Sequence, residues 1–542
     1  MEHGRTSSRP AEASALPAAP ATPMAASHRH SRSMLGRLPG WWPLIAVLAV
    51  QAGLSLRLMH SDTAFQDEAL YLWAGHLQWA HWLHGTPLPP FPSYFSGAPV
   101  LYPPLGALAD SIGGLTGARV LSLLFMLGTT AFLWTITSRL FGQRAAFFAA
   151  GLFAVLGPTL HLGAFATFDA MSLFLVALAT WCVVRAGERR DATGWMVAAG
   201  AALALANAAS YSSAVFDPVV LLLAFLVACP RPGGKSAAAR SLTMLIILAA
   251  LLAAGLLLGG NSYLHGIEIT TLDRVPGPDS AVSILADSWS WTGLIALLAV
   301  AAIIVSWVRH EGWERTWLIV VLACATLLVP LEQANLHTAA SLNKHGAVGA
   351  WFAAMAAGYV IDKFIAAAPA GRNRALTAGA CVIALAFPLS VGVTQSLTFS
   401  TSWPNAASFI AVFRPIADRG SEPLLVEDPS IAEYYLPAGR QWKRWSSTRN
   451  IVLPSGANTG HPSKSAGVVG NGNAATFARF IAAGYFSLVA LNFTDTTSLD
   501  HRIAADLRRN RHYRIIQIVP YGIEIPPIGQ GTYVIWRYEQ RP

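Results

Sequence analysis

Long apolar runs separated by short polar breaks are the feature that most limits what this chain can fold into. They recur from Trp41 to Gln395, over most of the 542 residues. A membrane-spanning helix needs about 20 predominantly apolar residues. We expect about eleven such helices, and one of them, from Phe216 to Ala228, is short for a span. The eleven runs begin near Trp42, Arg119, Ala145, Phe168, Trp195, Phe216, Ser241, Trp291, Trp317, Gly346 and Leu376.

The charge content supports a membrane protein. Charged residues make up 12% of the chain, about half of the roughly 25% that is typical of soluble domains. This argues against an ordinary soluble enzyme and against a disordered protein. The formal net charge is +9, but the basic residues are spread along the chain. Without a concentrated basic patch, the sequence does not predict a nucleic-acid partner.

The positions of the basic residues predict an orientation. Eleven alternating spans that start from a cytoplasmic N-terminus place 13 Lys and Arg residues of this region inside and four outside. This bias agrees with the positive-inside rule. The inner set is Arg139, Arg144, Arg185, Arg189, Arg190, Arg231, Lys235, Arg240, Arg309, Arg315, Lys363, Arg372 and Arg374. The outer set is Arg57, Arg119, Arg274 and Lys344. We therefore expect a multi-pass protein of the plasma or inner membrane.

Two polar regions flank the spans. Residues 1–40 are rich in Ala, Pro, Ser and Arg and predict a disordered cytoplasmic tail. Residues 41–396 form the predicted transmembrane domain, and residues 397–542 predict a small extracytoplasmic α/β domain. The expected strands are Pro423–Glu427, Phe486–Asn492, Tyr513–Val519 and Thr532–Tyr538, with helices at Ala474–Ala483 and Leu499–Asn510 and a mobile loop at Ser455–Asn473.

The first predicted outer loop, residues 60–118, holds an adjacent acidic pair, Asp67 and Glu68. An amphipathic stretch rich in Tyr and Trp follows the pair and predicts a helix in the membrane interface. A simpler explanation is that both acids only begin this helix, where negative charge suits the helix dipole. The same loop contains Leu101–Leu105, read as LYPPL, which predicts a rigid turn back to the bilayer.

Polar residues in other predicted outer segments give the acidic pair potential partners. Asp169 lies at the mouth of the fourth span, and Lys344 lies between the ninth and tenth spans. A cation could hold a phosphate, and a carboxylate could take a proton from a hydroxyl group. The polar residues around Lys344 are Glu332, Gln333, Asn335, His337, Asn343 and His345.

With these motifs in order, the chain resembles GT-C membrane glycosyltransferases, and among them the protein O-mannosyltransferase and aminoarabinose (lipid A) transferase group of glycosyltransferase family 39. The resemblance is carried by Asp67–Glu68, Tyr102-Pro103-Pro104, Asp169 and Ser341–Tyr359, and it covers roughly Trp41 to Gln395. It implies inverting transfer of one sugar from a polyprenyl-phosphate donor. The transfer would occur on the outer face of the membrane, to a lipid, glycan or protein.

The resemblance also implies roles for individual residues. Asp67 would be the general base, Glu68 its neighbour in the acidic pair and Asp169 the second acid of the active site. Lys344 would hold the donor phosphate. Tyr71 and Tyr102 would line the pocket, and His337 and His345, from the polar residues around Lys344, are further candidates for its lining. These residues predict no particular cofactor, and the sequence leaves open whether a divalent cation binds.

Other interpretations of the same residues remain. A transporter or flippase for a lipid-linked or small solute would need acids near the bilayer midplane, and a receptor would need no convergence of Asp67, Asp169 and Lys344. His76, His81 and His84 could bind a metal, but their spacing favours interface histidines. The QWKRW segment from Gln441 to Trp445 could bind a carbohydrate or an anionic lipid surface, and we expect a solvated domain edge there.

Overall fold

The computed structural model describes residues 41–230, 233–273, 276–400, 402–452, 468–470, 473–522 and 530–539. The expected tail, Arg231, Arg274 and most of the expected loop Ser455–Asn473 lie outside these ranges. Residues from Pro43 onward belong to one compact unit.

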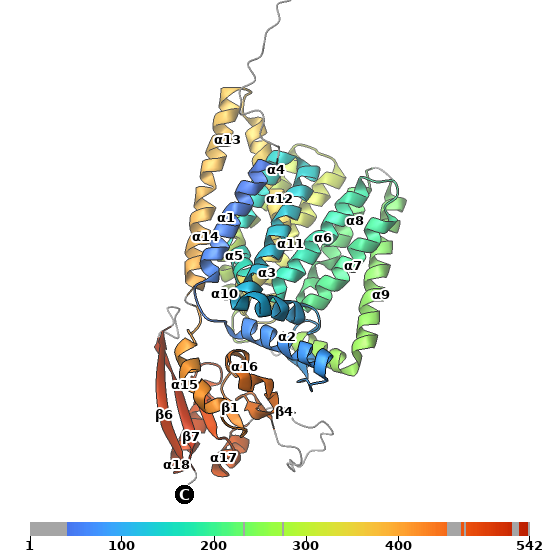
Figure 1. The fold of residues 1–542 in the computed structure, drawn as a ribbon. Helices are drawn as coiled ribbons and strands as arrows, with labels where there is room; N and C mark the ends of the chain where they lie inside the picture. Colours follow the sequence, from blue (N-terminus) through green and yellow to red (C-terminus); the bar gives the residue numbers. More distant parts are fainter. Residues whose placement is uncertain are drawn as a thin grey trace, which may run out of the picture. The chain divides into compact units, whose positions relative to one another are not determined.

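The chain is mainly helical from Trp42 to Phe399, which we call the helix bundle. Figure 1 shows α6, α7 and α8 side by side, with α9 along their outer side. The bundle consists of α1 (Trp42–Met59), α2 (Gln66–His84), η2 (Phe91–Ser93), α3 (Tyr102–Phe141), α4 (Gln143–Ala154), α5 (Gly157–Ala164), α6 (Phe168–Gly187), α7 (Thr193–Ala209), η3 (Tyr211–Phe216), α8 (Asp217–Ala228), α9 (Gly234–Ile267), η4 (Glu268–Leu272), α10 (Ala281–Val308), α11 (Trp313–Asn335), α12 (Leu342–Ala367), α13 (Arg372–Ala384) and α14 (Ala386–Phe399).

The expected multi-spanning fold is confirmed. Among the described residues, nine helical segments are long and apolar enough to cross a membrane, and the pair α4–α5, bent by 67°, makes a tenth. The remaining expected span, which begins near Trp195, coincides with α7, whose 17 residues make it a shorter apolar helix. Each predicted apolar run therefore corresponds to a helix or to a bent pair of helices.

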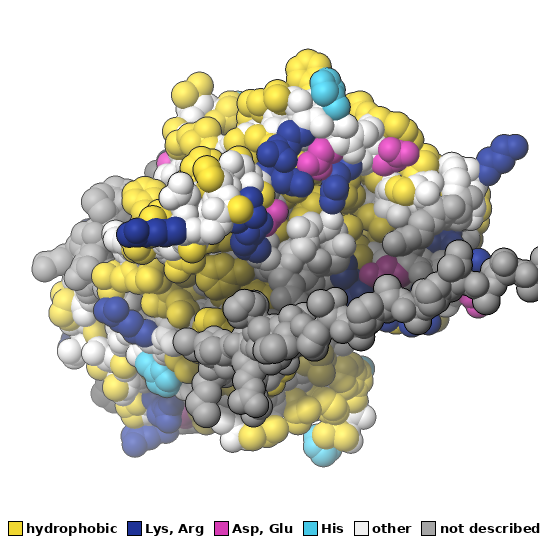
Figure 2. All heavy atoms as spheres, turned by 90° about the horizontal axis from the view of Figure 1, so that it is seen from above, with side chains coloured by type: hydrophobic (Ala, Val, Ile, Leu, Met, Phe, Trp, Pro, Cys, Tyr) yellow, Lys and Arg dark blue, Asp and Glu magenta, His cyan; other side chains and the backbone are white. Residues whose placement is uncertain are grey.

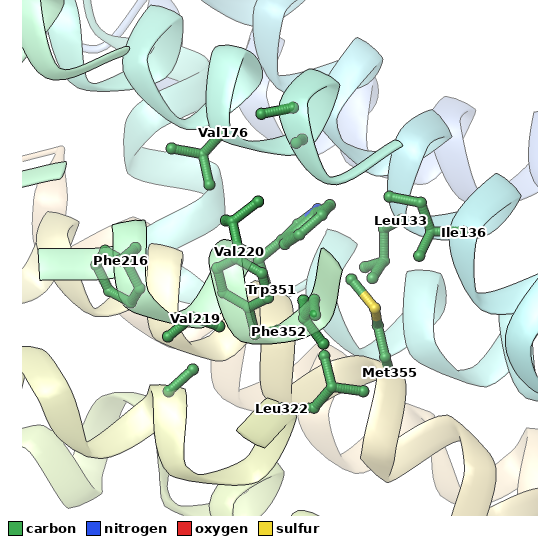
Figure 3. Close-up of a cluster of buried hydrophobic side chains, with 14 of the residues drawn as sticks. Leu133, Ile136, Val176, Phe216, Val219, Val220, Leu322, Trp351, Phe352 and Met355 are labelled. Carbon is green, nitrogen blue, oxygen red and sulfur yellow. The ribbon is translucent and has the colours of Figure 1, made fainter. Parts of the chain in front are cut away.

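Helix α12 lies at the centre of the bundle. Its residues from Gly349 to Val360 are buried, and Trp351 donates from its ring N–H to the carbonyl of Thr129 on α3 at 3.1 Å. Figure 3 shows Trp351, Phe352 and Met355 within an apolar cluster to which α3, α6, α8 and α11 contribute. A Cβ atom at Gly358 would collide with the carbonyl of Ala145, so glycine allows α4 to approach α12 closely. This packing fixes the start of α12, which carries Lys344.

The expected turn at Leu101–Leu105 is wrong. Pro103 and Pro104 stand in the first turn of the long helix α3, where proline is tolerated because its missing N–H would have no helical partner. The helix instead breaks at Gly113 and Gly114, where Gly114 has φ 62°. The segment Tyr102–Gly113 is therefore an entry helix that precedes the span.

A small α/β region, from α15 (Ala407–Ala417) to β7, follows the bundle. Its five-stranded sheet has the order β2-β1-β5-β7-β6, in which β2, β1 and β5 are parallel and β7 is antiparallel to both of its neighbours. The four expected strands and both expected helices are present, and the short strands β2, β3 and β4 were not predicted. The elements are β1 (Leu424–Val426), α16 (Ser430–Tyr435), η5 (Pro437–Arg440), η6 (Trp442–Arg444), β2 (Trp445–Ser446), β3 (Asn450–Val452), β4 (Val468–Gly470), α17 (Ala474–Ala482), β5 (Leu488–Leu491), α18 (Thr497–Arg509), β6 (Tyr513–Gly522) and β7 (Gln530–Tyr538).

The expectation of a solvated edge at Gln441–Trp445 is also wrong. Trp442, Arg444 and Trp445 are all buried. Trp442 packs into the aromatic cluster of α2 and donates from its ring N–H to the carbonyl of Pro87 at 3.0 Å. This segment therefore joins the α/β region to the loop that follows α2.

The helix ends farthest from the acidic pair carry ion pairs. Figure 2 views a face where Lys and Arg side chains lie beside Asp and Glu side chains, with hydrophobic side chains around them. The pairs include Arg139 with Glu188 at 2.8 Å, Arg144 with Asp362 at 2.6 Å and Lys363 with Glu311 at 3.0 Å. These residues belong to the loops for which the sequence predicts a cytoplasmic position.

Candidate active site

Three charged side chains from distant parts of the sequence meet at one end of the helix bundle. The Nζ atom of Lys344 lies 2.8 Å from Oδ2 of Asp67 and 3.3 Å from Oδ2 of Asp169. His345 adds its Nε2 atom at 3.5 Å from Oδ1 of Asp169. The structure thus brings together one carboxylate from α2, one from α6 and an ammonium group from α12.

All three charged residues stand in the first turn of their helices, and the reason differs between them. Asp67 and Asp169 are favoured there because a helix N-terminus carries a partial positive charge. Lys344 is disfavoured by the same effect at the start of α12. Its ammonium group is buried, and burial of an unpaired charge is costly. The two carboxylates therefore compensate a lysine that neither its helix nor its environment favours.

The three side chains differ in access. The side chains of Lys344 and Asp169 are each 7% exposed, whereas that of Asp67 is 34% exposed. Lys344, His345 and Asp169 line a cavity of about 20 Å³, which has room for about one water molecule. Serines from α6 and η3, together with Glu332 of α11, form much of its remaining polar wall. Asp67 is thus the most exposed of the three charged side chains.

Glu68, beside Asp67 in the sequence, has a different environment. It is fully buried, and its two oxygens accept hydrogen bonds from Nε and Nη2 of Arg119 at 2.8 and 2.7 Å. It also accepts from the backbone N–H of Ala166 at 2.7 Å and of Phe65 at 3.3 Å. Because Ala166 precedes α6, this carboxylate links the start of α2 to the segment that presents Asp169.

Arg119 is the partner that sequence reasoning missed. Besides Glu68, it donates to the carbonyls of Met59, Asp62 and Thr63, which connect α1 to α2. In the sequence, Arg119 appeared as a basic residue at the start of a span. An arginine flanking a span and an acid flanking a helix give no signal of pairing across 51 positions.

Of the expected pocket residues, His345 lines the cavity, whereas Tyr71 and Tyr102 are buried but do not line it. The ring of Tyr71 is buried and lies 4.7 Å from that of Phe168, next to Asp169. Burial, with Asp67 and Asp169 nearby, raises the pKa of Tyr71 well above its ordinary value, so its hydroxyl stays protonated. Tyr102 is fully buried, and its hydroxyl lies 3.3 Å from that of Ser122.

His337 does not join this group. It is exposed, and its Nδ1 atom lies 3.0 Å from the carbonyl of Asp279 in the loop before α10. Its backbone has φ 51°, as expected for a tight turn after α11. The structure therefore places His337 in the connection between α11 and α12, outside the cavity lining.

The histidines of α2 have other partners. The Nε2 atom of His76 lies 2.6 Å from Asp110, which also accepts from the Tyr434 hydroxyl at 2.7 Å. His81 lies near the carbonyl of Thr86. Across the described ranges, no group of three or more His, Cys, Asp or Glu side chains is placed to hold a metal ion. His76 instead helps to hold α2, α3 and α16 together.

Comparisons with known proteins bear on the fold of the chain. Residues 105–265 match the family model of dolichyl-phosphate-mannose-protein mannosyltransferases. This segment includes Arg119 and Asp169. A sequence search of curated proteins gives no match.

Solved structures give matches over nearly the whole chain. ArnT from Cupriavidus metallidurans bound to undecaprenyl phosphate is 15% identical, with a TM-score of 0.55, and the match covers 92% of this chain and 98% of that chain. Its apo state gives 14% identity and a TM-score of 0.54, covering 91% and 98% of the two chains. The apo oligosaccharyltransferase of Archaeoglobus fulgidus gives 14% identity and a TM-score of 0.50, covering 91% and 74%. The resemblance stated from the sequence is thus confirmed at the level of the fold.

Proposed function

We propose, from the premise that this chain has the fold of a GT-C membrane glycosyltransferase, that it transfers one sugar from a polyprenyl-phosphate donor to an acceptor hydroxyl, with inversion at the anomeric carbon. The observation that carries the proposal is the convergence of Asp67 and Asp169 on the ammonium group of Lys344. That set supplies a base for the hydroxyl and a cation for the phosphate. Undecaprenyl phosphate bound to the similar ArnT supports a lipid phosphate as part of the donor.

The donor phosphate would exchange with Asp67 on Lys344. Asp169 keeps Lys344 in place from the buried side, at 3.3 Å, while the more exposed Asp67 can move away. Arrival of the phosphate therefore frees the Asp67 carboxylate at the place where the acceptor enters. The exchange couples donor binding to activation of the base.

The chemistry needs no covalent enzyme intermediate. Asp67 takes the proton of the acceptor hydroxyl as its oxygen attacks the anomeric carbon. The bond from that carbon to the phosphate oxygen breaks, and the lipid phosphate leaves with the electron pair. Attack from the face opposite the leaving group inverts the configuration. Lys344 stabilises the negative charge on the leaving phosphate, and a positioned base contributes roughly 10²–10⁴-fold to the rate.

Glu68 acts in this proposal as a positioning residue. Its oxygens are held by Arg119 and by two backbone N–H groups, so it has no surface for a substrate. It fixes the distance between the start of α2 and the start of α6. Asp67 and Asp169 depend on that distance to meet at Lys344.

The reaction would take place on the extracytoplasmic side of the plasma or inner membrane. The basic loops of the opposite end of the bundle support a cytoplasmic position for that end, because basic residues favour the cytoplasm. The N-terminus would then lie in the cytoplasm and the α/β region outside. A transporter is less well supported, because it would need acids near the bilayer midplane. Both acids of the cluster lie instead in the first turns of their helices.

The direct test is a donor panel. Purified protein in lipid nanodiscs would be incubated with polyprenyl phosphates carrying single hexoses or pentoses, together with lipid, glycan and peptide acceptors. Mass spectrometry should detect one glycosylated acceptor and free polyprenyl phosphate. If no donor is consumed by the wild-type protein with any acceptor, while its donor binding is intact, the proposed transfer is wrong.

A further inference from the structure

The α/β region contains a cavity of about 510 Å³ that shares no lining residue with the active-site cavity. Its size lies within the roughly 300–1,000 Å³ of small-molecule pockets. We propose that it binds an anionic monosaccharide group, such as a sugar phosphate or a uronic acid. This proposal is independent of the transfer reaction above.

The position of the cavity follows from the sheet. Parallel α/β sheets usually bind ligands at the carboxyl ends of their strands, but here Glu427 occupies that edge. Just after β1, its carboxylate accepts hydrogen bonds from the backbone N–H groups of residues 492–495 at 2.6–2.8 Å. The protein's own acid thus fills the anion-binding place at the usual edge. The cavity lies at the opposite edge, where Pro423 precedes β1 and Ser487 precedes β5.

Three arginines give the cavity its charge. Arg419, Arg444 and Arg537 line it together with one acid, Glu422, which leaves a formal surplus of two positive charges. A guanidinium group presents a planar set of N–H donors that suits carboxylate and phosphate oxygens. The surplus equals the charge of a fully ionised sugar phosphate, so the cavity is complementary to this class of ligand.

Arg444 is held in a fixed position in the wall of the cavity. Its side chain is 8% exposed, and it donates to the carbonyls of Glu422 and Ala417 and to the side-chain oxygen of Gln441 at 3.1–3.2 Å. These neutral acceptors hold the guanidinium in place and use three of its five N–H groups. Burial also lowers the pKa of Arg444 from its ordinary value, as expected for a cation withdrawn from water. An anion in the cavity would offset this cost.

The other walls suit a sugar ring. Tyr485 and Tyr538 line the cavity, and Glu422 can accept hydrogen bonds from hydroxyl groups. Gly484, which precedes Tyr485 in the sequence, has φ 66°, and a Cβ atom there would collide with the ring of Tyr538. Glycine therefore permits both the local turn and the position of that ring. Aromatic faces with a few charged groups are typical of small-molecule sites.

Calorimetric titration of the full-length protein in detergent would test the proposal. The probes are glucose 1-phosphate, glucuronic acid, neutral glucose and inorganic phosphate. We expect both anionic sugars to bind and glucose to bind at least about tenfold more weakly, since charge-assisted hydrogen bonds are lost. If inorganic phosphate binds as tightly as glucose 1-phosphate, the assignment to a saccharide is overturned.

Variants of the lining arginines test whether the anionic sugars bind in this cavity. Arg419→Ala and Arg537→Ala change exposed side chains, so they should fold, and each should weaken binding about tenfold or more. Arg514→Ala is the matched control, because Arg514 pairs in register with Arg537 on the neighbouring strand but does not line the cavity. Lys344→Ala should leave the affinity unchanged. Wild-type affinity in Arg537→Ala, or loss of binding in Lys344→Ala, would overturn the proposal.

Discussion

Arg119 holds Glu68 in a two-bonded ion pair with both side chains almost fully buried, while the adjacent Asp67 remains 34% exposed beside Lys344. Successive residues of an α-helix point about 100° apart, so the two neighbouring acids face different partners. One carboxylate is structural, and the other is available for chemistry. The predictions below follow from this division.

Asp67→Asn should lose roughly 10²–10⁴-fold in transfer rate, because an amide cannot take the hydroxyl proton. The variant keeps the shape of the side chain, and Asp169 still pairs with Lys344 at 3.3 Å, so its thermal unfolding in detergent should stay close to that of the wild type. Mass-spectrometric turnover in nanodiscs measures the effect. The exposed neighbour provides a matched control, Gln66→Ala, which should retain activity. Sugar transfer by Asp67→Asn at nearly the wild-type rate would remove Asp67 as the base.

Lys344→Ala should weaken donor binding more than it weakens folding, since the phosphate loses its cation. Binding of a non-transferable donor analogue and the unfolding temperature would be measured on the same preparation. Lys363→Ala is the control, because Lys363 belongs to the same helix but pairs with Glu311 at its other end. Equal donor affinity in Lys344→Ala and the wild type would refute the phosphate-holding role.

Arg119→Leu should reduce the free energy of unfolding by about 3–5 kcal/mol, because Glu68 would stay buried without its counter-charge. The double variant Arg119→Leu/Glu68→Leu should be less destabilised than the single variant. Thermal unfolding of both proteins and of Glu68→Leu completes the cycle. Additive losses would mean that the two side chains are not coupled.

Asp500 of α18 predicts a pH dependence. Burial, followed by the nearby Glu427 carboxylate, raises the pKa of Asp500 from 3.8 to about 7. Between these values the folded state holds a proton that the unfolded state has released, so this residue's contribution to stability falls as pH rises. Asp500→Asn keeps a neutral side chain and should remove that loss. Its gain in unfolding temperature over the wild type should be larger at pH 8 than at pH 5, and an equal difference at both values would contradict the prediction.

The proposed orientation predicts which side of the membrane each end occupies. In a background without Cys182, Cys229, Cys324 and Cys381, a membrane-impermeant maleimide should label Ser421→Cys in right-side-out vesicles of a bacterial host. Arg190→Cys should be labelled only in inside-out vesicles. Both positions are exposed in the structure. The reverse labelling pattern would invert the orientation and place the reaction in the cytoplasm.

Most of the fold could be predicted because burial leaves a local pattern. Apolar runs predict the spans, and alternating runs predict β1, β5, β6 and β7. The strands β2, β3 and β4 have two or three residues each, too few for a periodic signal, whereas the equally short β1 stands out as an apolar run between Glu422 and Glu427. Pro103 and Pro104 were misjudged because proline suits both a turn and a helix start, and only the following chain decides between them.

The candidate site was predictable in part for a similar reason. Asp67, Asp169 and Lys344 come together because their helices start at the same end of the bundle. Assigning charged residues to one side of the membrane therefore predicted that these three lie in one region. The pairing of Glu68 with Arg119 depends on the direction of each side chain around its helix, which spacing alone does not give. The same holds for Trp442 and Arg444, whose alternating polarity resembles an exposed edge.

The cavity beside Lys344 accommodates about one water molecule, so a sugar that occupies it must displace surrounding side chains or separate the helices. The work of separation must come from contacts that the reacting atoms do not make, and a long polyprenyl chain lying along the lipid-facing helices can supply it. Headgroup analogues stripped of that chain should be poor inhibitors. If the proposed donor opens the site in this way, the closed site also keeps bulk water away from an activated sugar, and hydrolysis of the donor should be slow.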